Sequence, residues 1–209
     1  MNRAELKMAA KQQIKGKIGI LFVITLVIAV ISSIASVILG LIPVVGSLAA
    51  TVIVTPAFAL SVVRIYLNVV KGKAPELNDA FTGFDDFWAA FKVTFLVGLF
   101  TFLWSLLFFI PGIIKAISYS MSMYVLAENK GKPALQCIAE SKKMTEGHKM
   151  ELFILALSFI GWAIVGAITL GIAYIWIAPY MQVTMTNAYN YLKPVPVEVE
   201  AEVTVVEAE

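Results

Sequence analysis

The chain has 209 residues, of which 60% are apolar and only 14% charged, and its mean hydropathy is +0.87. A soluble domain of this length could not bury so much apolar surface, so the composition excludes an ordinary soluble protein. The apolar runs are about 20 residues long, enough for a helix to cross a hydrocarbon core of about 30 Å. A single cysteine, Cys137, and a single histidine exclude an internal disulfide and the usual zinc sites.

Long apolar runs separated by glycine and proline predict an all-α bundle of six transmembrane helices. Gly40 and Pro43 separate the first two runs, Pro111 and Gly112 the next two, and Gly171 the last two. Because these turns are short, each pair of runs is predicted to form a helical hairpin. The middle hairpin has two short runs, so a re-entrant hairpin stays open there. The six predicted spans are residues 18–39, 44–63, 93–110, 113–127, 152–169 and 172–191.

The basic residues predict the orientation of these spans. Fifteen of the sixteen Lys and Arg residues fall on one side of the predicted bundle, and only Lys115 falls on the other. Because basic residues concentrate on the cytoplasmic side of membrane proteins, both termini are predicted to lie in the cytoplasm and the protein in the cell membrane. A membrane-impermeant thiol reagent should then reach Cys137 only from the cytoplasm, unless the thiol is buried.

Three charged amphipathic segments, one before each hairpin, predict helices at the cytoplasmic membrane surface. They cover residues 3–15, 75–92 and 133–147 and suggest a pseudo-repeat of one helix and one hairpin. Residues 1–193 are therefore interpreted as a single integral membrane domain. Residues 194–209 are acidic and lack helical periodicity, which predicts a disordered cytoplasmic tail. A short strand-prone peptide that docks on a partner is the alternative for this tail.

The sequence contains no phosphate-binding loop, nucleophile elbow or zinc-protease motif, which lowers the expectation of an enzyme. The nearest catalytic candidate is His148 with Glu151, since their i, i+3 spacing places both on one helical face. At the cytoplasmic entrance of a span, this pair favours an interfacial charge role over proton transfer or metal binding. We therefore expect no enzymatic activity, no cofactor and no metal site.

Polar residues at or within predicted spans are the next candidates. Arg64 and Lys115 lie near span ends, which favours snorkelling of their side chains to the headgroups over a pore or substrate role. Lys115 is the better functional candidate, because it is the only basic residue assigned to the outer side. The last span is the most polar, and its Gln182 and Asn187 either contact a ligand or form hydrogen bonds between helices, the simpler interpretation.

The N-terminal segment places four basic residues on one helical face, namely Arg3, Lys7, Lys11 and Lys15. Such a stripe attracts anionic lipid by about 1 kcal/mol per residue, and it also serves as a plain topogenic signal. Membrane lipids are therefore the expected partners, and a homo-oligomer or a membrane-protein partner stays open. Nucleic-acid binding is not expected, because the stripe is short and tied to the membrane.

Four segments carry a resemblance to a known family. They are FFIPGIIKAISYSMSMYVLAEN (108–129), ALQCIAESKKMTEGHK (134–149), LFILALSFIGW (152–162) and ELKMAAKQQIKGK (5–17), and the shorter TLGI (169–172) and APY (178–180) agree as well. Together they resemble an uncharacterised prokaryotic integral membrane protein family, domain-of-unknown-function family 975. More distantly, the chain is similar to the membrane domain of some glycerophosphodiester phosphodiesterases. The resemblance implies a multi-helix membrane protein and supplies no substrate, reaction or site residue.

These observations favour a non-enzymatic membrane protein that works by associating with lipid or protein. The amphipathic segments and the missing catalytic motifs motivate this hypothesis. The alternative is a transporter of a small solute or a lipid headgroup, motivated by Lys115 and by the polar last span with Gln182.

Overall fold

The computed structural model describes residues 2–40 and 45–193, and every regular element in these ranges is a helix. Pro43 and the predicted tail at residues 194–209 lie outside the described residues. The elements are α1 (Arg3–Ile14), α2 (Ile18–Gly40), α3 (Val45–Val70), the 3-10 helix η1 (Leu77–Phe81), α4 (Phe87–Leu107), α5 (Phe109–Tyr119), α6 (Ser122–Glu128), α7 (Ala134–Met144), α8 (Lys149–Leu157), α9 (Ile160–Ile168) and α10 (Tyr174–Leu192). The predicted all-α class is confirmed.

Within the described ranges, four helical segments are long and apolar enough to cross a membrane. They are Ile18–Ile38, Phe87–Leu107, Ile110–Glu128 and Lys149–Ile168. The described part of α3 adds a shorter apolar stretch, Val54–Val70, and α10 is a more polar helix of 19 residues. These lengths and compositions are those of a multi-helix membrane protein, whereas the full count of six spans stays a prediction.

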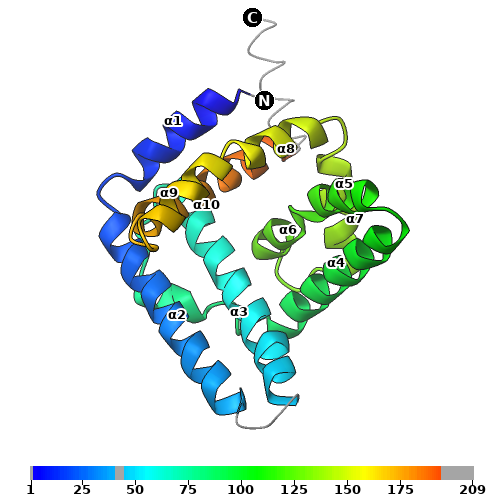
Figure 1. Ribbon diagram of the computed structural model, residues 1–209, viewed down its shortest axis with the longest axis horizontal. Helices are drawn as coiled ribbons and strands as arrows, with labels where there is room; N and C mark the ends of the chain where they lie inside the picture. The colour runs from blue at the N-terminus through cyan, green and yellow to red at the C-terminus, as the bar shows by residue number, and fades with distance from the viewer. Residues whose placement is uncertain (1, 41–44, 194–209) are drawn as a thin grey trace, which may run out of the picture.

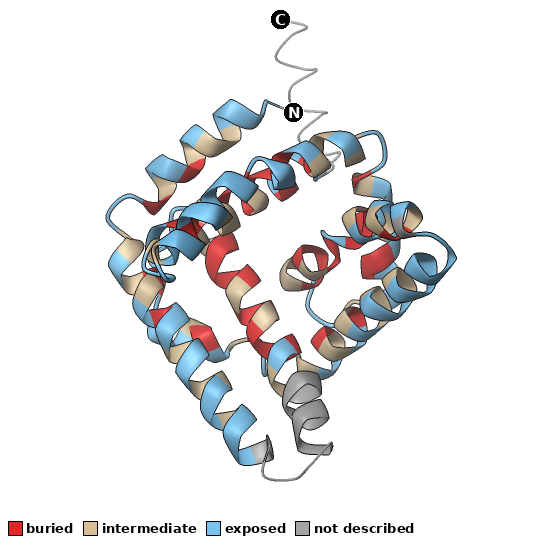
Figure 2. Ribbon diagram, in the orientation of Figure 1, coloured by how far each residue is buried: buried red, intermediate tan, exposed pale blue. Residues whose placement is uncertain are grey.

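The helices form three consecutive pairs: α2 with α3, α4 with the broken helix α5–α6, and the broken helix α8–α9 with α10 (Figure 1). The second member of each pair lies inside the molecule. Buried side chains gather on α3, α6 and α10, whereas α2, α4 and α9 expose large apolar side chains (Figure 2). In the core, Tyr124 of α6 stacks on Tyr189 of α10, with 5.2 Å between ring centroids. The outer helices therefore present a surface that suits contact with lipid.

The three polar segments pack against the three helix pairs in a cyclic order. Each segment packs against the pair that precedes it: η1 contacts α2 and α3, α7 contacts α4, α5 and α6, and α1 contacts α10 of the last pair. Asn187 of α10 donates a hydrogen bond to Oε1 of Gln13 in α1 at 2.9 Å. This cyclic order gives the suggested repeat of one polar segment and one helix pair a structural counterpart.

The helix predicted over residues 75–92 is wrong in its extent. Only Leu77–Phe81 forms a short 3-10 helix, and Phe87 already begins α4, six residues before the predicted span start at residue 93. A capping interaction fixes the start of η1, where the backbone N–H of Glu76 donates to Oδ2 of Asp79 at 2.9 Å. Close packing of residues 82–84 on α3 replaces the predicted continuation, so tertiary contacts override the helical periodicity here.

The fourth predicted span, residues 113–127, is broken in two. The break lies at Ser120 and Met121, and Ser141 of α7 bonds backbone groups just before it and within it. Its hydroxyl donates to the carbonyl of Ser118 at 2.8 Å and accepts from the N–H of Met121 at 3.1 Å. Backbone groups freed at a break inside a membrane need such partners, because lipid supplies none.

The turn between the third and fourth predicted spans also lies elsewhere. Phe108 has extended backbone angles and separates α4 from α5, whereas Pro111 and Gly112 lie within the first turn of α5. Proline is tolerated there because the first-turn N–H groups of a helix have no partner within the helix. The turn predicted at Gly171 is confirmed, since Gly171 has a φ of 91° between α9 and α10.

The fifth predicted span, residues 152–169, is broken as well, at Ser158 and Phe159 between α8 and α9. Here Lys7 of α1 supplies the contact. Its ammonium donates to the hydroxyl of Ser158 at 2.7 Å and lies 4.9 Å from the centroid of the Phe159 ring. A polar side chain from an amphipathic segment therefore contacts each of the two breaks.

Candidate functional site: an amphipathic groove beside the N-terminal helix

The contact of Lys7 determines which way α1 faces. Leu6, Ala10 and Ile14 pack inward, and Lys7 reaches the break between α8 and α9. Burial, followed by the neighbouring charges of Arg3 and Lys11, lowers the pKa of Lys7. Lys7 is therefore a docking residue within the fold, whereas the other three basic residues of the stripe remain exposed.

A groove of about 280 Å³ lies between α1, α9 and α10. Its walls are large apolar and aromatic side chains, and two lysines from the end of α1 complete them. The full lining is Lys11, Ile14, Lys15, Ile18, Trp162, Trp176, Ile177 and Tyr180. Tyr180 is buried, and its ring packs edge-on against Trp162 at 6.1 Å.

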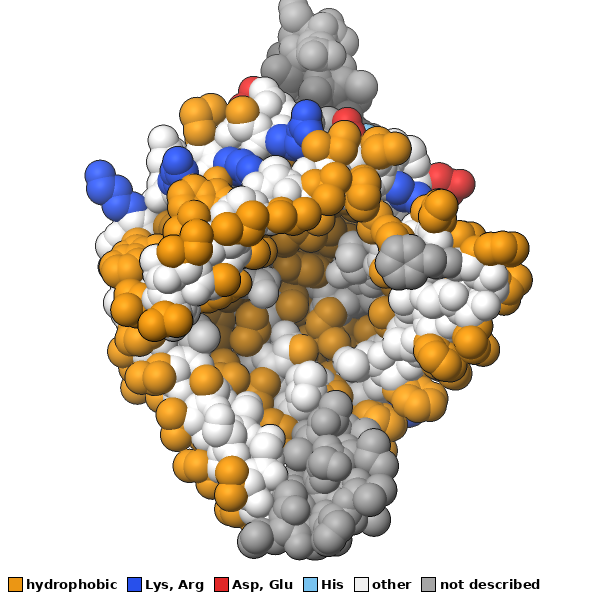
Figure 3. Space-filling view, viewed as in Figure 1, with side chains coloured by type: hydrophobic (Ala, Val, Ile, Leu, Met, Phe, Trp, Pro, Cys, Tyr) orange, Lys and Arg blue, Asp and Glu red, His pale blue; other side chains and the backbone are white. Residues whose placement is uncertain are grey.

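The groove combines two chemical properties. Lys11 and Lys15 are exposed and cationic, and none of the described residues that line the groove is acidic. Tryptophan and tyrosine are the residues that membrane proteins concentrate at the level of the headgroups. An anionic headgroup can therefore lie against the ammonium groups while an acyl chain lies along the aromatic wall. On the face shown in Figure 3, Lys and Arg side chains gather along the upper edge, over α1 and α8.

A second polar cluster ties the inner helices together at one end. The carboxylate of Glu128, at the end of α6, accepts from Nζ of Lys71 at 3.0 Å, from the hydroxyl of Tyr189 at 2.9 Å and from Nζ of Lys193 at 2.5 Å. These partners come from the ends of α3 and α10 and from the residue after α10. The side chain of Glu128 is 10% exposed, so removing it would leave three donors without their acceptor.

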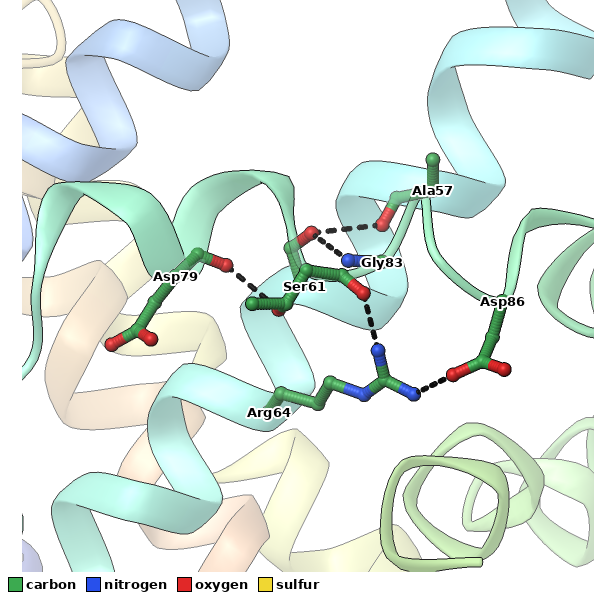
Figure 4. Close-up of polar contacts among 7 residues, drawn as sticks. Ala57, Ser61, Arg64, Asp79, Gly83 and Asp86 are labelled. Carbon is green, nitrogen blue, oxygen red and sulfur yellow. Dashed lines mark hydrogen bonds and ion pairs between the residues drawn. The ribbon is translucent and has the colours of Figure 1, made fainter. Parts of the chain in front are cut away.

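Arg64 is at the centre of a third cluster, on α3. Its guanidinium donates to the carbonyl of Thr82 and pairs with the carboxylate of Asp86 (Figure 4). One turn earlier, Ser61 accepts from the N–H of Gly83 at 2.8 Å and donates to the carbonyl of Ala57 at 3.2 Å. The snorkelling predicted for Arg64 is therefore wrong, because its buried side chain is held by the segment that precedes α4.

The remaining candidates from the sequence have separate surroundings. Lys115 is half-buried on α5, with its ammonium 4.4 Å from the centroid of the Trp104 ring of α4. Gln182 is half-buried on α10, in a different helix pair. Asn187 bonds Gln13 and also approaches the carbonyl of Leu6 at 3.4 Å, as expected for a hydrogen bond between helices. The transport hypothesis built on Lys115 and Gln182 stays a prediction.

His148 and Glu151 form the predicted i, i+3 pair. Nδ1 of His148 lies 2.7 Å from Oε2 of Glu151, and both side chains are 39% exposed. Among residues 2–40 and 45–193, no group of three or more His, Cys, Asp or Glu side chains is placed to hold a metal ion. This pair is a half-buried hydrogen-bonded contact at the start of α8.

Several important residues were missed from the sequence. The aromatic wall of Trp162, Trp176 and Tyr180 comes from two helices, and its contact with α1 has no local signal. Glu128 gave a weak signal, since it is an isolated acid at the end of an apolar run. Ser141 gave none, because a serine in an amphipathic segment is ordinarily solvated.

An all-helical fold with several membrane-length apolar helices and an amphipathic groove has the features of a helical membrane protein. The chain matches the profile of the family described as "Protein of unknown function (DUF975)" over residues 1–118 and 106–195, and it belongs to that family. A search of curated proteins and a search of solved structures each found no match. The comparisons therefore give no support to the more distant similarity to the phosphodiesterase membrane domain.

Proposed function

We propose that this chain is a non-enzymatic, multi-pass protein of the cell membrane that associates with anionic phospholipid through the groove beside α1. The single observation that carries the proposal is the groove beside α1, where Lys11 and Lys15 border a wall of aromatic side chains. Three of the four predicted lipid-contacting residues of α1, namely Arg3, Lys11 and Lys15, are exposed and available to headgroups. Association with a protein partner remains the alternative within this proposal.

The proposal includes six spans with both termini in the cytoplasm. The six would be α2, α3, α4, α5–α6, α8–α9 and α10. The distribution of fifteen of the sixteen basic residues supports this orientation. The contacts of Glu128 with Lys71 and Lys193 add support, because they bring the ends of α3, α6 and α10 to one side.

The orientation can be tested with one introduced thiol. Cys137 is 0% exposed, and burial raises the pKa of its thiol, so the native chain should resist a membrane-impermeant maleimide until it is denatured. Lys142→Cys places a thiol on the exposed side of α7. Inside-out vesicles should label this variant and intact cells should not, with the native chain as the unlabelled control. Labelling of the variant in intact cells would reverse the proposed orientation.

Lipid association is tested by replacing the two lysines of the groove. At about 1 kcal/mol for each basic residue, Lys11→Gln with Lys15→Gln should weaken phosphatidylglycerol binding roughly 30-fold. Native mass spectrometry of detergent-purified protein titrated with this lipid measures the loss. Trp176→Ala should also weaken phosphatidylglycerol binding, because it removes apolar contact. This loss of affinity should not depend on the salt concentration, since no charge is removed.

The matched control is Lys73→Gln with Lys142→Gln, which removes two exposed lysines outside the groove. This control should bind phosphatidylglycerol like the native chain. Equal losses in the control and groove variants would contradict a specific site. A native chain that retains a protein and no lipid would favour the protein-association alternative.

A further inference from the structure

A cavity of about 440 Å³ lies apart from the groove, between α3, the segment from η1 to α4, and the ends of α6 and α10. Its volume falls within the range of small-molecule sites, roughly 300 to 1,000 Å³. Side chains from all three helix pairs line it, so it forms only when the pairs assemble. On the proposed orientation it opens toward the cytoplasm.

The two walls of this cavity carry opposite charges. The wall formed by the helix ends carries Lys71, Lys130 and Lys193. Glu128 is the one carboxylate among the described residues of this wall, and it is already bonded to Lys71 and Lys193. This wall keeps a net positive charge. The facing wall, from the η1 segment, contributes the acids Asp79 and Asp85 together with Thr82.

Arg64 forms part of the cavity between these walls, and one of its donors has no partner. The residue is only 9% exposed, and its terminal nitrogens bond Thr82 and Asp86 (Figure 4). Its Nε is buried without a hydrogen-bond partner. Because this atom is enclosed by the surrounding protein, a ligand in the cavity meets the positive charge of the guanidinium and not this N–H.

We propose that this cavity binds a small zwitterion that carries an oxyanion at one end and an ammonium group at the other. The oxyanion, such as a phosphate, lies against Arg64, Lys71 and Lys130, and the ammonium group lies against Asp79 and Asp85. A simple anion would meet the two acids without compensation, and a simple cation would meet the lysines. Because each charged wall faces the ligand group of opposite charge, the cavity should bind the zwitterion more tightly than a simple anion or a simple cation.

This ligand could be a free solute or the headgroup of a zwitterionic lipid. O-phosphoethanolamine serves as the soluble probe, and phosphatidylethanolamine in nanodiscs as the lipid probe. Isothermal titration calorimetry of the purified full chain should show tighter binding of O-phosphoethanolamine than of inorganic phosphate or ethanolamine. If nanodiscs containing phosphatidylethanolamine abolish this binding and phosphatidylcholine nanodiscs do not, the natural source is the lipid headgroup. Unchanged binding in both kinds of nanodisc assigns a free solute.

Two exposed residues test the two ends of the ligand without disturbing buried contacts. At up to about 1 kcal/mol for one accessible charge pair, Asp85→Asn should weaken the zwitterion about fivefold and tighten phosphate binding, because it removes a repulsive charge. Lys130→Gln should weaken both ligands by a similar factor. Glu146→Gln and Lys142→Gln, which change exposed charges outside this cavity, are the controls.

Absence of zwitterion binding at millimolar concentration, or equal losses in the control variants, would overturn the cavity assignment. Neither result bears on the groove beside α1, because the cavity and the groove share no lining residue. The groove variants that lose phosphatidylglycerol binding should still bind O-phosphoethanolamine like the native chain. The two proposals can therefore fail separately.

Discussion

Gly83→Ala is expected to destabilise the folded protein by at least about 3 kcal/mol, at the upper end of the usual cost of overpacking. A Cβ at this position would lie 1.9 Å from the carbonyl oxygen of Ala57 and 2.8 Å from the backbone nitrogen of Ser61. Both are main-chain atoms of α3, so no side-chain rotation relieves the contact. The segment from η1 to α4 would have to move away from α3.

That movement would break several contacts together. The Gly83 N–H would lose Ser61, and Arg64 would lose the carbonyl of Thr82 (Figure 4). The edge-on contact between Phe58 and Phe84, with ring centroids 5.2 Å apart, would open as well. Arg64 would then be a buried charge with fewer partners, which adds to the loss.

Thermal unfolding in detergent, followed by circular dichroism, measures this effect. The matched control is Gly98→Ala on α4, where an added Cβ meets no atom within 4 Å. Alanine within a helix is about 0.5–1 kcal/mol more favourable than glycine, so the control should unfold at the native temperature or slightly above it. Equal unfolding temperatures for the two variants would show that residues 82–84 do not pack on α3 as described.

Ser141→Ala is expected to cost about 2–4 kcal/mol, because it leaves two buried main-chain groups at the break between α5 and α6 unpaired at about 1–3 kcal/mol each. Ser141 is 0% exposed, and its hydroxyl bonds the carbonyl of Ser118 and the N–H of Met121. Thr145 approaches the Ser118 carbonyl at 3.4 Å and offsets part of the loss.

Reversible unfolding in mixed micelles titrated with sodium dodecyl sulfate gives the free energy for this comparison. Ser120→Ala is the control, since Ser120 is exposed and its hydroxyl bonds only the carbonyl of Ile117, three residues earlier. The control should unfold within about 0.5 kcal/mol of the native chain. A Ser141→Ala variant as stable as the control would mean that water or lipid headgroups reach the break.

The positions of the helices could be predicted from the sequence because each depends on its own residues. Apolar runs of sufficient length gave α2 with nearly correct bounds and α4 with a start six residues too late, and the amphipathic periodicity gave α1 and α7 to within a few residues. Such patterns reflect the local periodicity of a helix facing lipid or core, which requires no knowledge of distant partners.

The breaks and the sites could not be predicted, because they depend on residues far apart in the chain. Ser141 lies 23 residues from Ser118, whose carbonyl it bonds, and Lys7 lies 151 residues from Ser158. Without those partners, each run reads as one continuous apolar helix. The surroundings of Arg64 could not be predicted for the same reason, since the carbonyl and the acid that hold it follow 18 and 22 residues later, in a segment predicted to lie at the membrane surface.

The contact of α1 with α10 also has a consequence for biosynthesis. Asn187 and Gln13, which join these helices, are 174 residues apart, and Lys7 meets Ser158 only after α8 has been made. Chains are synthesised from the N-terminus, so α1 emerges from the ribosome long before the surface that it covers exists. Until then its apolar face can lie on the membrane surface. α1 is therefore made long before it can reach its place in the fold.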